Sequence, residues 1–184
     1  MSAKCQEQSF VFGAANGNLE PKVTTLQSSH IGCKVLVRED YNAMKLVHVS
    51  ITARSADRLS AFYIDVFDCE EMRPPRTLSG EVVSRGNGLP NSMIYSIWLR
   101  FPDQETPFLE LLEYESSVDR VEPRVNEIGI SHLSFQLDDI QSTMSKILKA
   151  GGSALGETTN FGTTDEPFLI VYMRDCEGNI LELE

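Results

Sequence analysis

Two histidines and two glutamates of this 184-residue chain occur in matching sequence settings. His48 lies in "LVHVSI" and His132 in "ISHLSF", while Glu110 and Glu182 each lie at the centre of "LEL". Imidazole binds Zn, Ni, Co, Fe and Mn, and carboxylates favour harder, octahedral coordination with open water positions. Carboxylates also act as general bases. These four residues are therefore the first candidates for a chemical site.

An internal repeat relates the four candidates. An offset of 84 residues superposes His48 on His132 together with the segments around them, and an offset of 72 superposes Glu110 on Glu182. We attribute the difference of 12 to extra residues in the Gly/Pro-rich stretch 74–93 of the first half. Each half is then a β-α-β-β-β unit with one His on its first strand and one Glu on its last.

The elements that carry these residues follow from hydrophobic periodicity. Helical spacing of apolar residues predicts helices at 55–67 and 138–152, with Ser55 and an Asp as their N-caps. Alternation and β-branched content predict strands at 45–53, 93–101, 107–114, 129–137, 167–173 and 179–184.

Strand geometry predicts which way the candidates point. Successive side chains of a strand face opposite sides of the sheet. The apolar neighbours of each candidate suit packing under the helices, so the four polar side chains should point from the helix-free faces. If the two units pair about a pseudo-two-fold axis, the four meet in one cleft that would bind one divalent cation. A lone His or Glu is more often an ordinary surface or core residue. However, chance does not readily place a His and a Glu at equivalent positions of both repeats.

The predicted fold class is α+β, with two tandem βαβββ modules forming a metal-containing cleft between curved mixed sheets. The first module spans 45–128 and the second spans 129–184. Residues 1–44 form an N-terminal arm with a possible extra strand at 31–37, because this segment is polar and rich in Gly, Asn and Ser.

Composition limits the classes of partner. The net charge of -11 argues against nucleic acid and anionic membranes, since both need clustered Lys and Arg. No apolar run approaches the roughly 20 residues of a membrane span, and the N-terminus lacks signal-peptide features. Four scattered cysteines without a CxxC pair favour reduced thiols. We expect a cytoplasmic protein with a small-molecule substrate.

Three segments resemble the vicinal oxygen chelate superfamily, which includes glyoxalases, methylmalonyl-CoA epimerases, fosfomycin and bleomycin resistance proteins and extradiol dioxygenases. They are "LVHVSITARSADRLSAFYIDVF", "GISHLSFQLDDI" and "RDCEGNILEL", and the resemblance covers residues 45–184. The last segment matches an Asp-Pro-Asp-Gly-Asn-like turn leading into Ile-Glu-Leu, although Cys176 and Glu177 replace the Pro and the second Asp. By motif, the metal ligands fall on the four candidates: His48, Glu110, His132 and Glu182.

The resemblance implies a metal-dependent lyase or isomerase of the glyoxalase type. One divalent ion (Zn, Ni, Co, Mn or Fe) would chelate two vicinal oxygens of a substrate and stabilise an enediolate. Glu182 would be both a ligand and the principal base for the proton alpha to the carbonyl, with Glu110 as the second catalytic carboxylate. The family also suggests homodimers, sometimes with modules exchanged between chains.

Other readings of the same fold stay open. Glu110 counts against an Fe(II) extradiol-type dioxygenase, because those enzymes have no carboxylate ligand there. Methylmalonyl-CoA epimerases usually carry Gln at this position. Glyoxalase I carries Glu, but "VEPRVNEIGISH" does not match its longer signature before the third ligand. A small-molecule binding or resistance protein is a further alternative, and the substrate and native metal are undetermined.

Some residues have weaker assignments. Trp98 and Tyr172 are expected in the core, with a pocket-lining role as the alternative. Arg54, Arg100 and Arg174 could hold a substrate carboxylate, although surface or salt-bridged roles are favoured. The segment 80–92 is either an active-site lid or an ordinary surface excursion.

Overall fold

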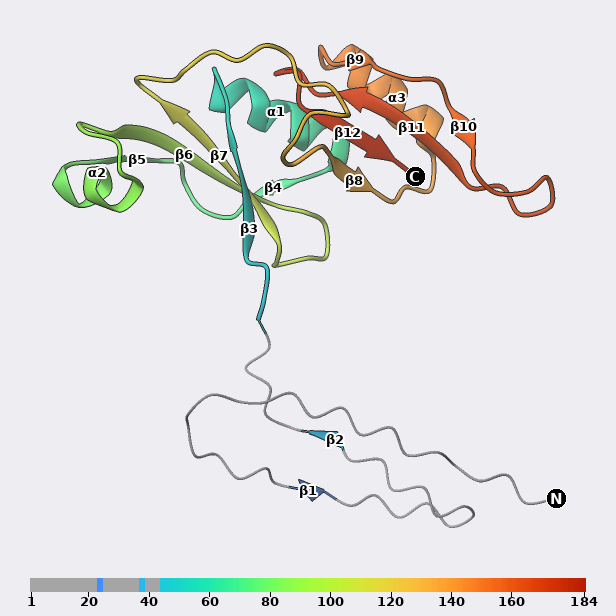
Figure 1. The fold of residues 1–184 in the computed structure, drawn as a ribbon, viewed down its shortest axis with the longest axis horizontal. Helices are drawn as coiled ribbons and strands as arrows, with labels where there is room; N and C mark the ends of the chain where they lie inside the picture. The colour runs from blue at the N-terminus through green and yellow to red at the C-terminus, as the bar shows by residue number, and fades with distance from the viewer. Residues whose placement is uncertain (1–22, 25–36, 39–43) are drawn as a thin grey trace. The chain divides into compact units, whose positions relative to one another are not determined.

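The computed structural model describes residues 23–24, 37–38 and 44–184 (Figure 1). The chain divides into two units, Met1–Lys45 and Leu46–Glu184. In the first unit, β1 (Val23–Thr24) and β2 (Val37–Arg38) form an antiparallel pair. The predicted strand at 31–37 lies outside the described residues except for Val37, which belongs to β2.

The first half of the second unit forms a five-stranded sheet with the order β3-β7-β6-β4, and β5 also pairs with β6. Strands β3 and β7 are parallel and the other pairs are antiparallel. The segment 80–92 contains a short helix, α2, rather than only loop. The elements are β3 (His48–Thr52), α1 (Ala56–Phe67), β4 (Glu70–Glu71), β5 (Arg76–Ser79), α2 (Glu81–Asn87), β6 (Met93–Arg100) and β7 (Phe108–Tyr114).

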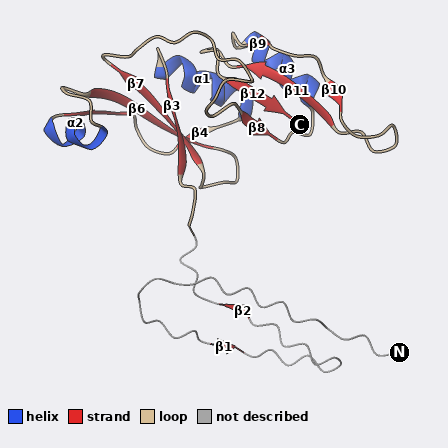
Figure 2. Cartoon of the chain, in the orientation of Figure 1, coloured by secondary structure: helices blue, strands red, loops and turns tan. Residues whose placement is uncertain are grey.

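The second half repeats this plan with the order β10-β11-β12-β8, and β9 also pairs with β11 (Figure 2). Its first and last strands, β8 and β12, are again parallel. The prediction of two tandem modules with mixed sheets is confirmed. The elements are β8 (Leu133–Phe135), α3 (Ile140–Lys149), β9 (Ser153–Ala154), β10 (Thr159–Asn160), β11 (Leu169–Arg174) and β12 (Ile180–Leu183).

The two longer helices begin at the predicted caps. The Ser55 hydroxyl accepts a hydrogen bond from the Arg58 N–H at the start of α1, and Asp139 accepts one from the Ser142 N–H at the start of α3. Among the described residues, no helix is long and apolar enough to cross a membrane.

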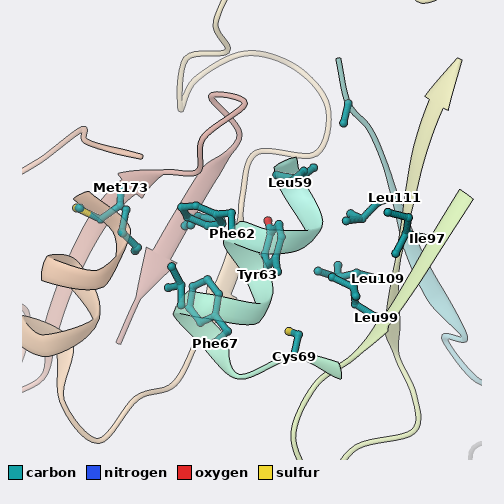
Figure 3. Close-up of a cluster of buried hydrophobic side chains, with 14 of the residues drawn as sticks. Leu59, Phe62, Tyr63, Phe67, Cys69, Ile97, Leu99, Leu109, Leu111 and Met173 are labelled. Carbon is teal, nitrogen blue, oxygen red and sulfur yellow. The ribbon is translucent and has the colours of Figure 1, made fainter. Parts of the chain in front are cut away.

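Helix α1 lies in the middle of the hydrophobic core (Figure 3). Its fully buried Leu59 and Tyr63 face side chains from the first sheet, and Met173 of the second sheet lies on the other side of the helix. Leu109, Leu111, Leu181 and Leu183 all belong to this core. Because side chains alternate along a strand, Glu110 and Glu182 face away from the core. The predicted assignment of faces is therefore confirmed for both glutamates.

A buried turn connects β11 to β12 and so sets the position of Glu182. The Asp175 side chain accepts hydrogen bonds from the backbone N–H groups of Glu177 and Asn179, at 2.8 and 2.9 Å, and from the Asn179 side chain at 2.7 Å. Tyr63 of α1 donates a fourth, at 3.3 Å. Burial raises the pKa of Asp175, and these hydrogen bonds act in the opposite direction. Gly178 takes the left-handed conformation, with φ +87°, that ends the turn.

Replacing Asp175 with Asn should destabilise the fold. An Asn NH₂ group would replace one carboxylate oxygen. It would then face hydrogen-bond donors, and an NH₂ group cannot accept hydrogen bonds. The expected loss is about 2 kcal/mol in the free energy of unfolding, the scale of a hydrogen bond to a charged group. Urea denaturation measures it, with Asp165→Asn in the exposed β10–β11 hairpin as the control. Equal stability of the two variants would show that the turn does not depend on the carboxylate.

Candidate metal centre

His48 and Glu110 come together on the helix-free face of the first sheet. The parallel register of β3 and β7 sets Ser50 directly beside Glu110, two residues after His48. The His48 Nε2 atom lies 3.5 Å from Glu110 Oε2. Ser50 Oγ donates to the same carboxylate oxygen at 2.6 Å, and Trp98 Nε1 donates to Oε1 at 3.0 Å.

His132 and Glu182 form an equivalent pair on the second sheet. His132 Nε2 lies 3.6 Å from Glu182 Oε2, although His132 itself precedes β8 rather than lying within it. Ser134 Oγ donates to Glu182 Oε1 at 3.1 Å. Tyr172 stands directly opposite Glu182 in the register of β11 and β12, and its interaction with the Glu182 carboxylate raises the pKa of the phenol.

The two pairs share four kinds of residue, of which the sequence analysis singled out the His and the Glu. Each contains a His, a Glu, a Ser and an aromatic N–H or O–H donor, with Ser50 matched by Ser134 and Trp98 by Tyr172. The serines follow from the offset of 84 that relates the histidines. Trp98 and Tyr172 stand directly opposite the glutamates in their sheets, a relation that only the strand register reveals. Neither aromatic residue is a purely apolar core residue.

These donors explain how each glutamate is tolerated in the middle of a strand. The side chains of Glu110 and Glu182 are only 16% and 14% exposed. An unpartnered carboxylate at such burial would be costly. Glu110 accepts hydrogen bonds from Ser50 and Trp98, Glu182 accepts one from Ser134, and an imidazole lies near each carboxylate. Both positions are therefore built to hold negative charge.

The described part of one chain brings the candidates together two at a time. It contains no group of three or more His, Cys, Asp or Glu side chains placed to hold a metal ion. However, the first strands of both modules, β3 and β8, are edge strands. A cavity of about 350 Å³ is lined by Ser50 and Thr52 from one module and by Ser131 and His132 from the other, and of the four candidates its lining includes His132 alone. The four-ligand site in a single cleft remains a prediction.

The donor set within each pair suits a divalent cation. Ligand atoms bound to one ion at about 2.1 Å lie roughly 3.0–3.4 Å from each other. The imidazole-to-carboxylate distances of 3.5 and 3.6 Å are therefore close to the spacing of neighbouring ligands. His48 and His132 would bind through Nε2, and Glu110 and Glu182 through one carboxylate oxygen each.

The three arginines considered for substrate binding form salt bridges or hydrogen bonds within the chain. Arg54 pairs with Asp119 and Glu177, and Arg100 pairs with Glu70. Arg174 donates to two backbone carbonyls, those of Gly178 and Pro123. These contacts support the favoured interpretation of salt-bridged and structural roles.

The fold agrees with a family comparison. The model of the glyoxalase/bleomycin resistance protein/dioxygenase superfamily matches residues 45–183. The chain belongs to this superfamily. The match spans both modules and contains all four candidate residues, and it begins where the structure separates the second unit from the first.

Individual relatives are distant. Among curated proteins, the chain is similar to the mitochondrial methylmalonyl-CoA epimerase of Homo sapiens, with 22% identity over 78% of this chain and 75% of the relative. Among solved structures, it is similar to a glyoxalase family protein from Bacillus cereus, with 22% identity, a TM-score of 0.67 and coverage of 81% of this chain and 97% of that one. The trypanothione-dependent glyoxalase I of Leishmania major gives 15% identity, a TM-score of 0.55 and coverage of 77% and 86%. These structural likenesses establish the fold.

Proposed function

We propose that this superfamily member is a metal-dependent enzyme that moves a proton on the carbon alpha to a substrate carbonyl, as an isomerase or lyase of the glyoxalase type. The observation that carries the proposal is the repetition of one constellation, His–Glu with a Ser and an aromatic donor, in both modules. A structural role for a single buried Glu would not require the same histidine and serine twice. The match to an epimerase supports the isomerase class of chemistry.

A divalent ion at this site would supply the Lewis acidity that makes the proton alpha to a carbonyl acidic. The chain supplies the remaining functions. His48 and His132 would act as neutral ligands. One glutamate would act as ligand and the other as ligand and base, since the reaction needs a group that accepts a proton and returns it.

The contacts of the two glutamates support Glu182 as the base. Glu110 accepts two hydrogen bonds, from Ser50 at 2.6 Å and from Trp98 at 3.0 Å. Glu182 accepts one, from Ser134 at 3.1 Å. A carboxylate held by fewer hydrogen bonds can reach a substrate proton more easily than one that two hydrogen bonds fix in place.

Completing one site from both pairs requires a rearrangement or a second chain. Either the modules close on the ion across the cavity between β3 and β8, or two chains of a homodimer each contribute one pair. We propose a homodimer with a small-molecule substrate. Mixing variant chains separates the two arrangements.

The proposal is tested by metal content and proton exchange. Protein purified without chelators or a His-tag should contain one divalent ion per chain. In D₂O, it should catalyse exchange of the proton alpha to the carbonyl in 2-hydroxycarbonyl compounds or acyl thioesters, as followed by NMR. EDTA should abolish exchange, and one equivalent of metal should restore it.

The same assay separates the alternative chemistries. Exchange should continue without oxygen, because proton transfer is not a redox reaction. Oxygen consumption with a catechol substrate would instead support a dioxygenase. Tight binding of small molecules without metal and without exchange would support a binding protein.

A further inference from the structure

An arginine outside the sequence-based predictions lies beside the first pair. The Arg73 guanidinium carbon is 4.0 Å from the centre of the Trp98 ring. The indole N–H of Trp98 donates to Glu110. The Trp98 indole therefore contacts both Arg73 and the candidate metal ligand Glu110, on the face of the sheet that carries the His–Glu pair.

Arg73 has no carboxylate partner within the described part of the chain. The Arg73 Nη1 atom donates a long hydrogen bond, 3.5 Å, to the carbonyl of Pro74. The second guanidinium nearby belongs to Arg76, which likewise forms no salt bridge with a described residue. Burial and the nearby Arg76 charge lower the pKa of Arg73, whereas Glu110 raises it. Two neighbouring cations without carboxylate partners are unusual in a chain with a net charge of -11.

The same face holds an unsatisfied hydroxyl. Ser96 lies two residues before Trp98 on β6 and directly opposite Arg76 on β5. Among the described residues, Ser96 Oγ is the buried side-chain polar atom without a hydrogen-bond partner. Buried polar groups are nearly always satisfied, so this hydroxyl points to a missing acceptor. An anion held by the two arginines would bring acceptor oxygens to this part of the sheet.

Among the described residues, no Lys or Arg is recorded beside Tyr172 as Arg73 is beside Trp98. Tyr172 takes the place of Trp98, and the segment between β9 and β10, residues 155–158, contains no Lys or Arg. A positive charge beside the first His–Glu pair only would orient an asymmetric substrate relative to the two otherwise equivalent pairs.

We propose that Arg73, placed over the Trp98 ring with Arg76 nearby, binds a carboxylate of the substrate, so that the substrate carries an anionic group in addition to its two vicinal oxygens. The planar guanidinium matches a carboxylate with two parallel hydrogen bonds. Contact with the indole limits the rotation of the guanidinium, and its hydrogen bond to Pro74 is a long one that a carboxylate can replace. Arg73 is a specificity residue in this assignment, and the assignment rests on the metal-dependent function proposed above.

Two simple hydroxy acids test the inference. Lactate and malate share a hydroxyl and a carboxylate on adjacent carbons, and malate adds a second carboxylate. Calorimetry on the full chain loaded with Mn²⁺ should show that malate binds about tenfold or more tightly than lactate, the scale of one charge-assisted hydrogen-bonded pair. Arg73→Gln should remove this preference and leave lactate affinity unchanged.

Further variants separate charge from structure. Arg73→Lys should keep part of the preference, because it keeps the charge without the planar fork. Arg85→Gln removes one exposed charge from α2 and should change neither affinity. Thermal unfolding of each variant verifies that the fold is retained.

The outcomes are distinguishable. If the wild-type chain does not bind Mn²⁺, the proposed metal-dependent function fails and the inference fails with it. If the metal binds but malate has no advantage over lactate, or keeps its advantage in Arg73→Gln, the role of Arg73 is overturned while the metal centre stands.

Discussion

Replacing Glu182 with Gln should reduce turnover by about a hundredfold or more while substantial metal binding is retained, the usual scale for loss of a general base. Gln keeps the shape of the side chain and an oxygen that can bind a cation, but it cannot accept the substrate proton. Glu110→Gln should have a milder effect, because hydrogen bonds from Ser50 and Trp98 fix Glu110 in place, as expected of a ligand.

Both variants should be measured at saturating metal, with proton exchange as the readout. Glu166→Gln in the exposed β10–β11 hairpin provides a matched control for the loss of one carboxylate. Near wild-type exchange in Glu182→Gln together with an inactive Glu110→Gln would show that the base belongs to the first module. Equal and large losses in both variants would indicate that the two carboxylates share the proton transfer.

His48→Ala and His132→Ala should each weaken binding of Zn, Ni or Co by at least about a hundredfold, beyond the 10–100-fold typical of residues that only support a ligand. Each substitution removes one of two nitrogen donors from the predicted site. His30, the third histidine of the chain, supplies the control variant His30→Ala, which should bind one ion per chain, as we expect of the wild type. Stoichiometric binding with unchanged affinity in both His48→Ala and His132→Ala would contradict the ligand assignment.

Combining the two histidine variants reveals which chain supplies each pair. If one ion is shared between two chains, a heterodimer of His48→Ala with His132→Ala contains one intact site and one site lacking both histidines. Such a heterodimer should recover strong binding of one ion per two chains. If the ion lies within one chain, every site in the mixture lacks one histidine and no recovery should occur. Titration of the separately tagged and purified heterodimer gives the answer directly.

The sequence by itself predicted the modular plan and the faces of the strands. Helical spacing in 55–67 and strand alternation around Glu110 and Glu182 are local patterns, and local patterns determine which side chains point to a core. The offset of 84 residues that relates His48 to His132 also relates Ser50 to Ser134, so the repeat contained more of the constellation than the two histidines. The predicted strand at 129–137 was too long, because β8 covers only Leu133–Phe135.

Only the tertiary structure decided which side chains become neighbours across strands. Trp98 donates to Glu110, and Tyr172 pairs with Glu182, because antiparallel register places residues from different strands opposite each other. Arg73 reaches Trp98 through the β4–β5 connection, a contact with no periodic signal in the sequence. Register and loop path depend on the packing of the whole sheet against α1, so the chemical surroundings of each glutamate could not be derived from its own segment.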